Sequence, residues 1–405
     1  MTDRRRLLVL ASTYPRWAGD PEPAFVHELA RRLVGSFDVT VLCPHAEGAA
    51  VREVMDGVNI VRYRYAPARI EVLINGGGIM ANLRRSRWRW LLLPGFLVSQ
   101  LLATWRITRS FRPNVIHAHW IVPQGLVARL ASIGLRRAAP LLLTSHGVDL
   151  FSLRGKFSMW LKRRVVRAAT AMTVVSSAMI PEALHLGADA ASCEVLPMGT
   201  DMTTRFTPQP VEREPTRLLF VGRLVEKKGL AHLLDAMPGI IHRHPSAVLD
   251  VVGFGPLLLV LKERVKALKL DGKVRFLGAV PNHELPEIYS RAGLLVAPFV
   301  VAASGDQEGL GLVVVEAVAC GCPVVIGEVP ATREFGLDTL SPVTPAQITD
   351  AVTTLLDNSS ADRRALADRQ RGIVADRFEW ARVAARYEYL LAKLVVDSDR
   401  FGEGG

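Results

Sequence analysis

Residues 247–277, AVLDVVGFGPLLLVLKERVKALKLDGKVRFL, contain the pattern that decides the fold. Two short apolar runs, Ala247–Val252 and Lys273–Leu277, enclose a stretch with helical periodicity, Pro256–Lys269. The apolar runs show little polar–apolar alternation, which is typical of parallel strands that are buried on both faces. The glycines between Val252 and Pro256 suit a turn from strand to helix. The stretch therefore predicts a β-α-β unit of an α/β sheet.

The same alternation extends along the chain on both sides of this unit. In the first half we expect strands at Leu7–Ser12, Asp38–Cys43, Val58–Tyr63, Asn114–His119, Pro140–Ser145, Ala171–Val175 and Cys193–Leu196. The helical patterns between them are Glu22–Val34, Phe96–Ser110, Pro123–Ser132, Lys156–Ala169 and Ser177–Leu186. The second half adds strands at Arg217–Val221, Gly293–Ala297 and Pro323–Ile326, helices at Gly229–Ile241, His283–Arg291 and Gly309–Ala319, and three helices after Pro345.

This order predicts two successive doubly wound, Rossmann-like α/β domains. Residues 1–200 form the first domain and residues 217–375 the second. Residues 201–216 are the expected linker, because this polar stretch contains three prolines and lacks apolar periodicity. We expect residues 376–405 to form a helix that crosses back to the first domain and ends in a flexible tail. Ligand sites in such domains lie at the carboxyl ends of the strands and in the cleft between the domains.

The charge of the chain is concentrated in its first half. The 405 residues carry a formal net charge of +11, yet residues 1–200 hold 26 Lys and Arg against 13 Asp and Glu, a net +13. Residues 201–405 hold 24 against 26, a net −2. Between Val72 and Val148 there are ten arginines and no acidic residue. The N-terminal half therefore requires an anionic partner or surface.

Three further features bear on the class of the protein. Four cysteines, Cys43, Cys193, Cys320 and Cys322, are too few and too scattered for a disulfide framework or a zinc site, and they fit a reducing cytoplasm. The apolar run Leu7–Ala11 is short for a signal peptide and predicts a first strand instead. The longest apolar stretch, Leu91–Trp105, is interrupted by Pro94, Gly95, Ser99 and Gln100, which argues against a transmembrane helix.

A candidate diphosphate site follows the strand that ends at Val221. Gly222 permits a tight turn, and Arg223 and Lys228 extend from the loop before the next helix. Two cations beside a helix N-terminus suit a diphosphate, and the alternative is a solvated basic loop. Gly253 and Gly255 form a second glycine turn between strand and helix, which by itself is a weak signal.

A pair of glutamates, Glu308 and Glu316, lies eight residues apart in DQEGLGLVVVE, residues 306–316. With a helix that begins near Gly309, Glu308 would be the N-cap and the two carboxylates would share one helix face. The backbone amides of Gly309, Leu310 and Gly311 would then be free to meet an anion. The Glu316 carboxylate requires a partner if buried, and the hydroxyls of a ribose would serve. The alternative is a capping glutamate and an ordinary salt bridge.

Histidines end two apolar strands of the first half. His117 and His119 are two residues apart and point to the same face of their strand, but no third ligand has spacing suitable for zinc, so we interpret them as buried structural residues. His146, in TSHGVD, residues 144–149, is the better functional candidate.

The motifs together resemble family 4 (group 1) glycosyltransferases of the GT-B fold. They are STYP…GDPEPAFVHELARRL, HAHW, TSHGVD, VGRLVEKKG, VVGFGP, VRFLGAV and EGLGLVVVEAVACGCPVV, and they cover nearly the whole chain in the family's order. The resemblance implies two domains that face each other across a deep cleft. It also implies a retaining hexosyltransferase that uses a nucleotide-diphosphate sugar as substrate and needs no metal or other cofactor.

The resemblance also assigns roles to individual residues. Arg223 and Lys228 match the cations that hold the donor diphosphate and stabilise the departing nucleotide, and Glu316 matches the carboxylate that binds the ribose. Glu308 and the backbone of residues 309–311 match the loop at the donor sugar and phosphate. His146 matches the histidine near the reacting face of the sugar. The first glycine loop departs from the family's Gly-Gly pair, so that only Gly19 is carried over.

Two basic segments of the first half suit an anionic bilayer interface, because arginine, tryptophan and leucine interleave there. The predicted membrane or acceptor residues are Arg84, Arg85, Arg87, Trp88, Arg89, Trp90, Lys162, Arg163 and Arg164. For the second segment, the alternative is an inward apolar face with a solvated basic face. No nucleic-acid module is recognised, so we expect no nucleic-acid partner.

The predicted partners are a nucleotide-sugar donor, a saccharide or polyprenyl-lipid-linked acceptor, and the cytoplasmic face of the plasma membrane. Alternative functions are another GT-B nucleotide-sugar enzyme (an epimerase or a phosphorylase), a glycosyltransferase with a soluble acceptor, and a non-catalytic anion-binding protein.

Overall fold

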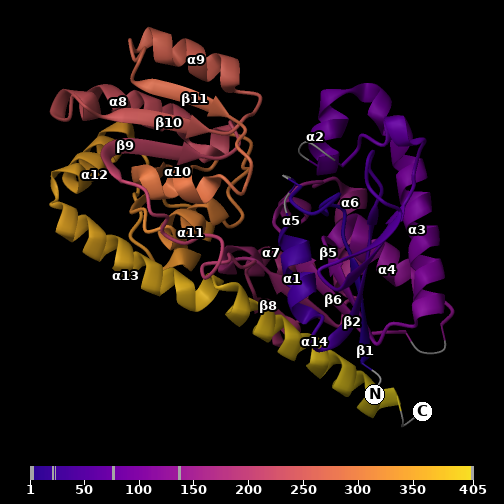
Figure 1. Ribbon diagram of the computed structural model, residues 1–405. Helices are drawn as coiled ribbons and strands as arrows, with labels where there is room; N and C mark the ends of the chain where they lie inside the picture. The colour runs from indigo at the N-terminus through magenta and orange to yellow at the C-terminus, as the bar shows by residue number, and fades with distance from the viewer. Residues whose placement is uncertain (1–3, 21, 23, 75–77, 136–137, 403–405) are drawn as a thin grey trace. The chain divides into compact units, whose positions relative to one another are not determined.

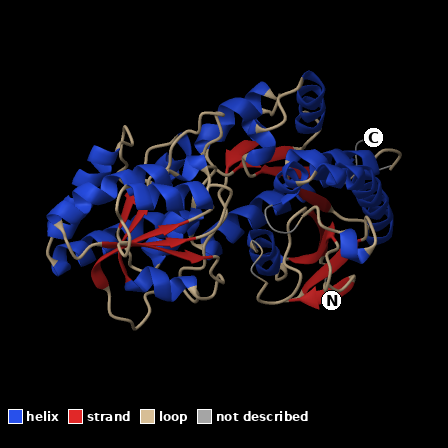
Figure 2. Ribbon diagram, turned by 90° about the horizontal axis from the view of Figure 1, so that it is seen from above, coloured by secondary structure: helices blue, strands red, loops and turns tan. Residues whose placement is uncertain are grey.

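The computed structural model describes residues 4–20, 22, 24–74, 78–135 and 138–402. The chain forms two compact units (Figure 1). Unit 1 comprises Met1–Met198 and Val383–Gly405, and unit 2 comprises Gly199–Arg382. Figure 2 shows the strands of the sheets in red between helices in blue. This is the layer order expected when near-continuous apolar strands bury both faces.

Unit 1 is built on an eight-stranded sheet of order β3-β4-β2-β1-β5-β6-β7-β8, in which β3 is antiparallel and the other strands are parallel. Its strands are β1 Arg5–Leu10, β2 Phe37–Pro44, β3 Arg52–Met55, β4 Val58–Tyr63, β5 Val115–His119, β6 Leu141–Ser145, β7 Ala171–Val174 and β8 Cys193–Val195. Its helices are α1 Phe25–Leu33, α2 Gly78–Arg85, α3 Leu92–Phe111, α4 Leu126–Ala131, α5 Val148–Phe151, α6 Lys156–Val166, α7 Ile180–His185 and most of α14, Trp380–Gly402.

Unit 2 has a five-stranded parallel sheet of order β11-β10-β9-β12-β13. Its strands are β9 Glu214–Val221, β10 Val248–Val252, β11 Val274–Gly278, β12 Ala292–Ala297 and β13 Val324–Ile326. Its helices are α8 Leu230–Arg243, α9 Leu258–Ala267, α10 Leu285–Arg291, α11 Leu312–Ala319, α12 Pro345–Asp357 and α13 Ser360–Phe378. The strand order corresponds to the 3-2-1-4-5 winding of a Rossmann-like domain.

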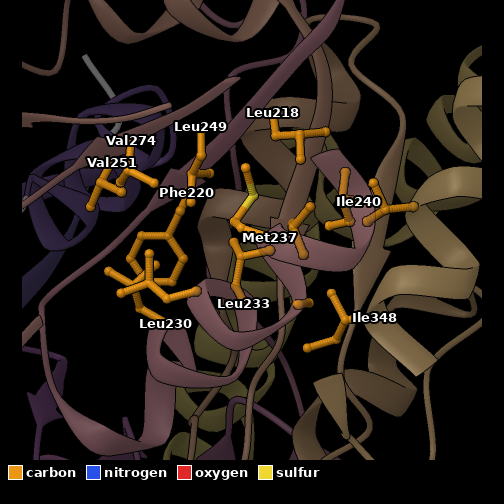
Figure 3. Close-up of a cluster of buried hydrophobic side chains, with 14 of the residues drawn as sticks. Leu218, Phe220, Leu230, Leu233, Met237, Ile240, Leu249, Val251, Val274 and Ile348 are labelled. Atoms are coloured by element: carbon orange, nitrogen blue, oxygen red, sulfur yellow. The ribbon is translucent and has the colours of Figure 1, made fainter. Parts of the chain in front are cut away.

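The core of unit 2 lies between its sheet and α8 (Figure 3). Phe220 and Leu249, from neighbouring strands, pack with Leu233 and Met237 of α8, and Ile348 of α12 closes the cluster. All five side chains are essentially inaccessible to solvent. At about 25 cal/mol per Å² of buried apolar surface, such side chains each contribute about 1.5–3 kcal/mol.

Several expected boundaries differ from the structure. The edge strand β3 was not predicted, because exposed and half-buried residues alternate in it and none is fully buried. Strand β9 begins at Glu214, inside the predicted linker. The preceding residues also pack on unit 2, where the Arg213 guanidinium donates to the carbonyl oxygens of Tyr289, Ala292 and Cys320. These carbonyls fix a segment that has no apolar periodicity of its own.

The apolar stretch 91–105 is not interrupted as expected. Helix α3 runs continuously through Pro94 and Gly95, because both residues lie in its first turn, where a proline costs no intrahelical hydrogen bond. The run Arg87–Phe111 is the one described segment long and apolar enough to cross a membrane, judged by length and composition alone. Only 22% of its apolar window is buried. It packs on α4 and on strands β2 and β4 of unit 1.

Helix α14 ends the described chain within unit 1. Tyr387 is fully buried there and donates a hydrogen bond to the Leu196 carbonyl at 3.1 Å, while its ring stacks on His117. Ser36 donates to Glu388 on the same helix at 2.5 Å. The last helix of the sequence is therefore part of the N-terminal fold.

Candidate functional site

The site in unit 2 lies where its sheet reverses winding direction. Strands β9 and β12 are neighbours, and the connection after β9 leads to β10 on one side while the connection after β12 leads to β13 on the other. Ligands of doubly wound sheets bind outside the carboxyl ends of the strands at this switch point. The loops concerned are residues 222–229 and 298–311.

An ion pair joins these two loops. Lys228 Nζ lies 2.7 Å from Glu308 Oε2, and each side chain is only 13% exposed. The same ammonium lies 4.9 Å above the centre of the Phe299 ring. Burial by itself would raise the pKa of the Glu308 carboxyl, but Lys228, Lys227 and the Leu310 amide hold it below its usual value. The site thus combines a shielded cation with an ionised carboxylate.

Neighbouring contacts fix the loops around the pair. Lys227 Nζ lies 3.0 Å from Asp306 Oδ1 and donates to the Gln307 carbonyl at 3.1 Å. Glu226 accepts a hydrogen bond from the Ala303 amide at 2.8 Å. The three consecutive residues 226–228 therefore hold the β12 loop at three separate points, which limits the motion of Glu308.

Close backbone approaches explain three of the glycine positions. A Cβ on Gly229, which has φ of +71°, would lie 1.7 Å from the Pro298 carbonyl oxygen. A Cβ on Gly253 would lie 1.9 Å from the Gly222 carbonyl oxygen. Gly255 likewise faces the backbone of Leu224. The structure thus gives Gly253 and Gly255 a packing role, and donor binding by Gly222, Gly253 and Gly255 stays a prediction.

The glutamate pair differs from the expected arrangement. Helix α11 begins at Leu312 with Gly311 as its N-cap, so that Glu308 precedes the helix and is not its cap. Gly311 has φ of +79°, which reverses the chain between Glu308 and the helix, while Gly309 and Leu310 lie in the preceding loop. The helix starts late because two glycines interrupt the pattern and stop it from continuing upstream. The carboxylates therefore do not share a helix face.

Glu316 has a neutral partner instead of the ordinary salt bridge. The buried Tyr289 hydroxyl donates to Glu316 Oε2 at 2.9 Å. Burial raises the pKa of the Glu316 carboxyl, opposed by the Tyr289 hydrogen bond and the charges of Arg205 and Lys228. Among the described residues, no hydrogen bond to the other carboxylate oxygen, Oε1, is formed. Tyr289, Phe299 and Arg205 were not predicted, because they occur outside the motifs.

Arg223, the other predicted diphosphate ligand, is exposed in the loop after β9. The structure therefore places both predicted cations in one loop, with Lys228 engaged and Arg223 open to solvent. Among the described residues, no group of three or more His, Cys, Asp or Glu side chains is arranged to hold a metal ion.

In unit 1 an aromatic cluster surrounds His146, which follows β6. His146 Nε2 and His119 Nδ1 share a hydrogen bond of 3.0 Å, and the two rings stack at an interplanar angle of 12°. Phe25 and Trp120 pack against His146 at 4.8 and 5.0 Å between ring centres. Trp120 has φ of +77°, which is strained for a bulky residue and turns its side chain at the end of β5.

The histidines of this cluster are neutral. Burial lowers the pKa of His117 to about 3 and also lowers the pKa of His119 and His146. His117 Nε2 bonds to Thr144 Oγ1 at 2.7 Å, consistent with the predicted structural role. Asp149 accepts hydrogen bonds from the Ile121 amide and the Ser145 hydroxyl, which fixes the two loops that carry Trp120 and His146.

Gly19 lies in an exposed turn after β1. It has φ of +80°, and the turn is closed by Asp20, which pairs with the Arg16 side chain at 2.6 Å and accepts its backbone N–H at 2.7 Å. Pro21 and Pro23, which follow Gly19 in the motif GDPEPAFVHELARRL, lie outside the described residues. Gly19 therefore serves a local turn, and its contact with phosphate stays a prediction.

The predicted membrane residues differ in their exposure to solvent. Arg84, Arg85, Arg87, Trp88, Trp90 and Arg164 are exposed, and Arg89 and Arg163 are half-buried on Asn82 and His185. The prediction is wrong for Lys162, which is 1% exposed and donates to the carbonyls of Leu150 and Ser152. Those carbonyls at the end of α5 need a donor, and the lysine supplies it. The alternative for this segment, an inward apolar face of α6, does not hold for Phe157 and Trp160, because both side chains face solvent.

Comparison with known proteins identifies the family. The model for "Glycosyl transferases group 1" matches residues 202–373, and the "Glycosyl transferase 4-like domain" matches residues 23–199. A GDP-mannose-dependent alpha-(1-6)-phosphatidylinositol monomannoside mannosyltransferase of Mycolicibacterium smegmatis is 30% identical, over 71% of this chain and 79% of that protein. The chain belongs to the group 1 glycosyltransferases. It is a glycosyltransferase enzyme of the GT-B fold.

A further relative and a solved structure each match almost the whole of this chain. A glycogen synthase of Mycobacterium tuberculosis is 28% identical, over 96% of this chain and 95% of that protein. The sucrose-phosphate synthase structure from Thermosynechococcus elongatus superimposes with a TM-score of 0.76 and 19% identity, over 97% of this chain and all of that one. The second similarity shows the fold alone. The mannosyltransferase and the glycogen synthase are named for different reactions, so that membership of the family leaves the donor sugar and the acceptor of this chain open.

Proposed function

We propose that the chain transfers a hexose from a nucleotide-diphosphate sugar to a saccharide or lipid-linked acceptor. The transfer proceeds with retention, without a metal, at the cytoplasmic face of the membrane. The observation that carries the proposal is the Lys228–Glu308 pair at the switch point of unit 2, where the fold binds ligands.

The donor diphosphate is the anion that suits Lys228 and Arg223. Negative charge develops on the β-phosphate as the bond to the anomeric carbon breaks, and a shielded ammonium opposes that charge more strongly than one in water. Arg223 is exposed in the same loop and supplies a planar donor for a second phosphate oxygen. Lys228 therefore stabilises the departing nucleotide, and Arg223 holds it.

The carboxylates of Glu308 and Glu316 accept hydrogen bonds from hydroxyl groups of the donor. Glu308 is ionised and held by the loop contacts described above, so that it accepts hydrogen bonds from the sugar. Glu316 has one oxygen occupied by Tyr289 and offers the other to the ribose. In a front-face reaction the leaving phosphate takes the proton of the acceptor hydroxyl, which accounts for retention without a protein base.

The membrane part of the proposal rests on helix α3. Its buried residues include Gln100, Thr104 and Thr108, whereas Val98 and Leu102 are exposed. An ordinary surface helix has the reverse polarity. With Trp88 and Trp90 exposed just before the helix and arginines on both sides, this face suits an anionic bilayer interface. The mannosyltransferase relative is named for a lipid acceptor, which supports the same choice.

A nucleotide-binding experiment tests the donor site. We expect one nucleoside diphosphate among UDP, GDP and ADP to raise the unfolding temperature, because a ligand at 100 times its Kd stabilises by about 2.7 kcal/mol. The stabilisation should vanish in the Lys228→Ala variant and persist in Lys227→Ala. Incubation with the matching sugar donor and EDTA, followed by NMR of the anomeric proton, then tests metal independence and retention. A product of inverted configuration, or a strict metal requirement, contradicts the proposal.

Vesicle co-sedimentation tests the membrane part. We expect binding to vesicles that contain an anionic lipid, and weaker binding in high salt, because surface charges are screened. Leu102→Gln should lower vesicle binding. Val54→Gln, which also replaces an exposed aliphatic side chain by an amide but on β3, should not. Equal binding of wild type to neutral and anionic vesicles contradicts the electrostatic part. Failure to bind either kind indicates a soluble acceptor.

A further inference from the structure

Four arginines and one tryptophan line a hollow of about 410 Å³ in unit 1. The residues are Arg129 of α4, Trp160, Arg163 and Arg164 of α6, and Arg167 just beyond α6. Trp160, Arg163, Arg164 and Arg167 are spaced i, i+3, i+4 and i+7, which places them on one face of the helix and its C-cap. Among the described residues, no acidic side chain lines the hollow.

None of the contacts made by the four arginines among the described residues involves a carboxylate. Arg129 donates to the Arg164 carbonyl at 2.9 Å, and the Arg164 guanidinium lies 5.5 Å from the centre of the Trp160 ring. Arg163 donates to His185 Nε2 at 2.9 Å. The Arg167 side chain packs beside Gly187, where a Cβ would lie 2.6 Å from its Nε.

The four charges are not balanced by the protein. Among the described residues, none of the four guanidiniums forms an ion pair with a carboxylate, whereas Arg217, Arg264 and Arg275 in unit 2 all do. Like charges gathered around one hollow repel, and the repulsion is relieved when an anion enters. Guanidiniums bind phosphate through paired N–H groups, whose planar fork matches two phosphate oxygens.

The hollow is separate from the histidine cluster of unit 1. Helix α6 runs from the end of β6 toward the start of β7, so that Arg163–Arg167 lie toward the amino ends of the strands. His146 and Trp120 follow the carboxyl ends of β6 and β5. An anion in the hollow therefore lies at the other end of the sheet from these two residues.

We propose that the hollow formed by Arg129, Trp160, Arg163, Arg164 and Arg167 is a binding site for a phosphate group. The phosphate belongs to a soluble phosphate compound or to the head group of an anionic lipid. Trp160 contributes an exposed apolar surface beside the charges, which either source would cover in part. The site does not depend on the proposed donor chemistry, because all its residues lie in unit 1.

Two binding measurements on the full chain test the site and distinguish the sources. Inorganic pyrophosphate is titrated by calorimetry, and vesicles of phosphatidylglycerol in phosphatidylcholine are tested by co-sedimentation. The test variant is Arg164→Gln with Arg167→Gln. The control is Arg52→Gln with Arg64→Gln, which gives the same change of charge at two exposed arginines, one on the edge strand β3 and one just after its neighbour β4. Both variants keep the donor site, so that its contribution cancels in the comparison.

The expected result is a loss of affinity of at least about tenfold in the test variant relative to the control. A loss toward pyrophosphate identifies a soluble phosphate as ligand, and a loss toward anionic vesicles alone identifies a lipid head group. If the test variant matches the control in both measurements, or if wild type binds neither probe, the proposal is overturned. Circular dichroism of both variants checks that the fold is kept.

Discussion

Replacing Lys228 by alanine should separate stability from catalysis at the donor site. The change leaves the Glu308 carboxylate, only 13% exposed, without the ammonium 2.7 Å away. Loss of one partner of a buried ion pair costs about 3–5 kcal/mol, and the small exposure of this pair reduces the expected cost to about 2–4 kcal/mol. Adding Glu308→Gln removes the stranded charge, so that the double variant should regain most of the lost stability.

Turnover should respond differently. Lys228 opposes charge on the leaving group in the proposed mechanism, so that Lys228→Ala lowers turnover by about a hundredfold or more, and Glu308→Gln does not restore it. The neighbouring Lys227→Ala is the matched control. Its partner Asp306 is 61% exposed, and such surface pairs contribute less than about 1 kcal/mol.

Urea unfolding and initial rates with the donor found by the nucleotide screen measure both effects. The reasoning is refuted if Lys228→Ala is no less stable than Lys227→Ala, or if the double variant is less stable than Lys228→Ala alone. Turnover of Lys228→Ala close to that of wild type refutes the assignment of the leaving-group site. A rescue of stability without a rescue of turnover supports both parts.

Three further predictions concern the fold and its response to pH. Gly229→Ala should lower the free energy of unfolding by more than about 3 kcal/mol, because the new Cβ would clash with the Pro298 carbonyl. Gly272→Ala has open space around the new Cβ, so that only the left-handed backbone strain at φ of +77° remains, about 1–2 kcal/mol. Urea unfolding of the two variants compares these costs. Burial keeps His117 neutral in the folded protein, whereas the unfolded chain protonates it, so its contribution to the free energy of unfolding is full above pH 6.5 and decreases below that pH. His117→Gln should therefore reduce the slope of the free energy of unfolding against pH by up to about 1.4 kcal/mol per pH unit. An unchanged slope contradicts this prediction. The depressed pKa of Glu308 adds stability that is present above pH 4.5 and is lost as the pH falls through the folded value. The free energies of unfolding of wild type and Glu308→Gln should therefore converge in acid. A difference between them that increases in acid contradicts the ion pair.

Much of the fold could be predicted because local patterns carry it. The β-α-β unit at residues 247–277 is present as β10, α9 and β11, and the three helices after Pro345 are present as α12, α13 and α14. Apolar runs of strand length and periodic helices are properties of adjacent residues, so that the sequence displays them directly. Boundaries differed where side chains from elsewhere decide them, as at Arg213, whose three carbonyl partners fix the chain before β9.

Parts of the site could not be predicted, because they depend on contacts between distant residues. Lys228 and Glu308 were each singled out, but their meeting across 80 positions follows from the pairing of β9 with β12. Tyr289, the partner of Glu316, carries no motif. Lys162 was misplaced for the same reason, since its carbonyl partners lie 10 and 12 residues away in a turn that periodicity does not describe.

The sequence by itself determined the two α/β domains, the family and the uneven charge. Each of these properties can be inferred from local patterns, from composition, or from motifs that keep their order along the chain. Only the tertiary structure decided which charges are paired and which are open. It buried Lys162, joined Lys228 to Glu308, and left Arg164 and Arg167 around a hollow without a carboxylate. The physical reason is that solvent exposure and the distance between charges are set by how helices and strands pack, and the order of residues alone contains neither.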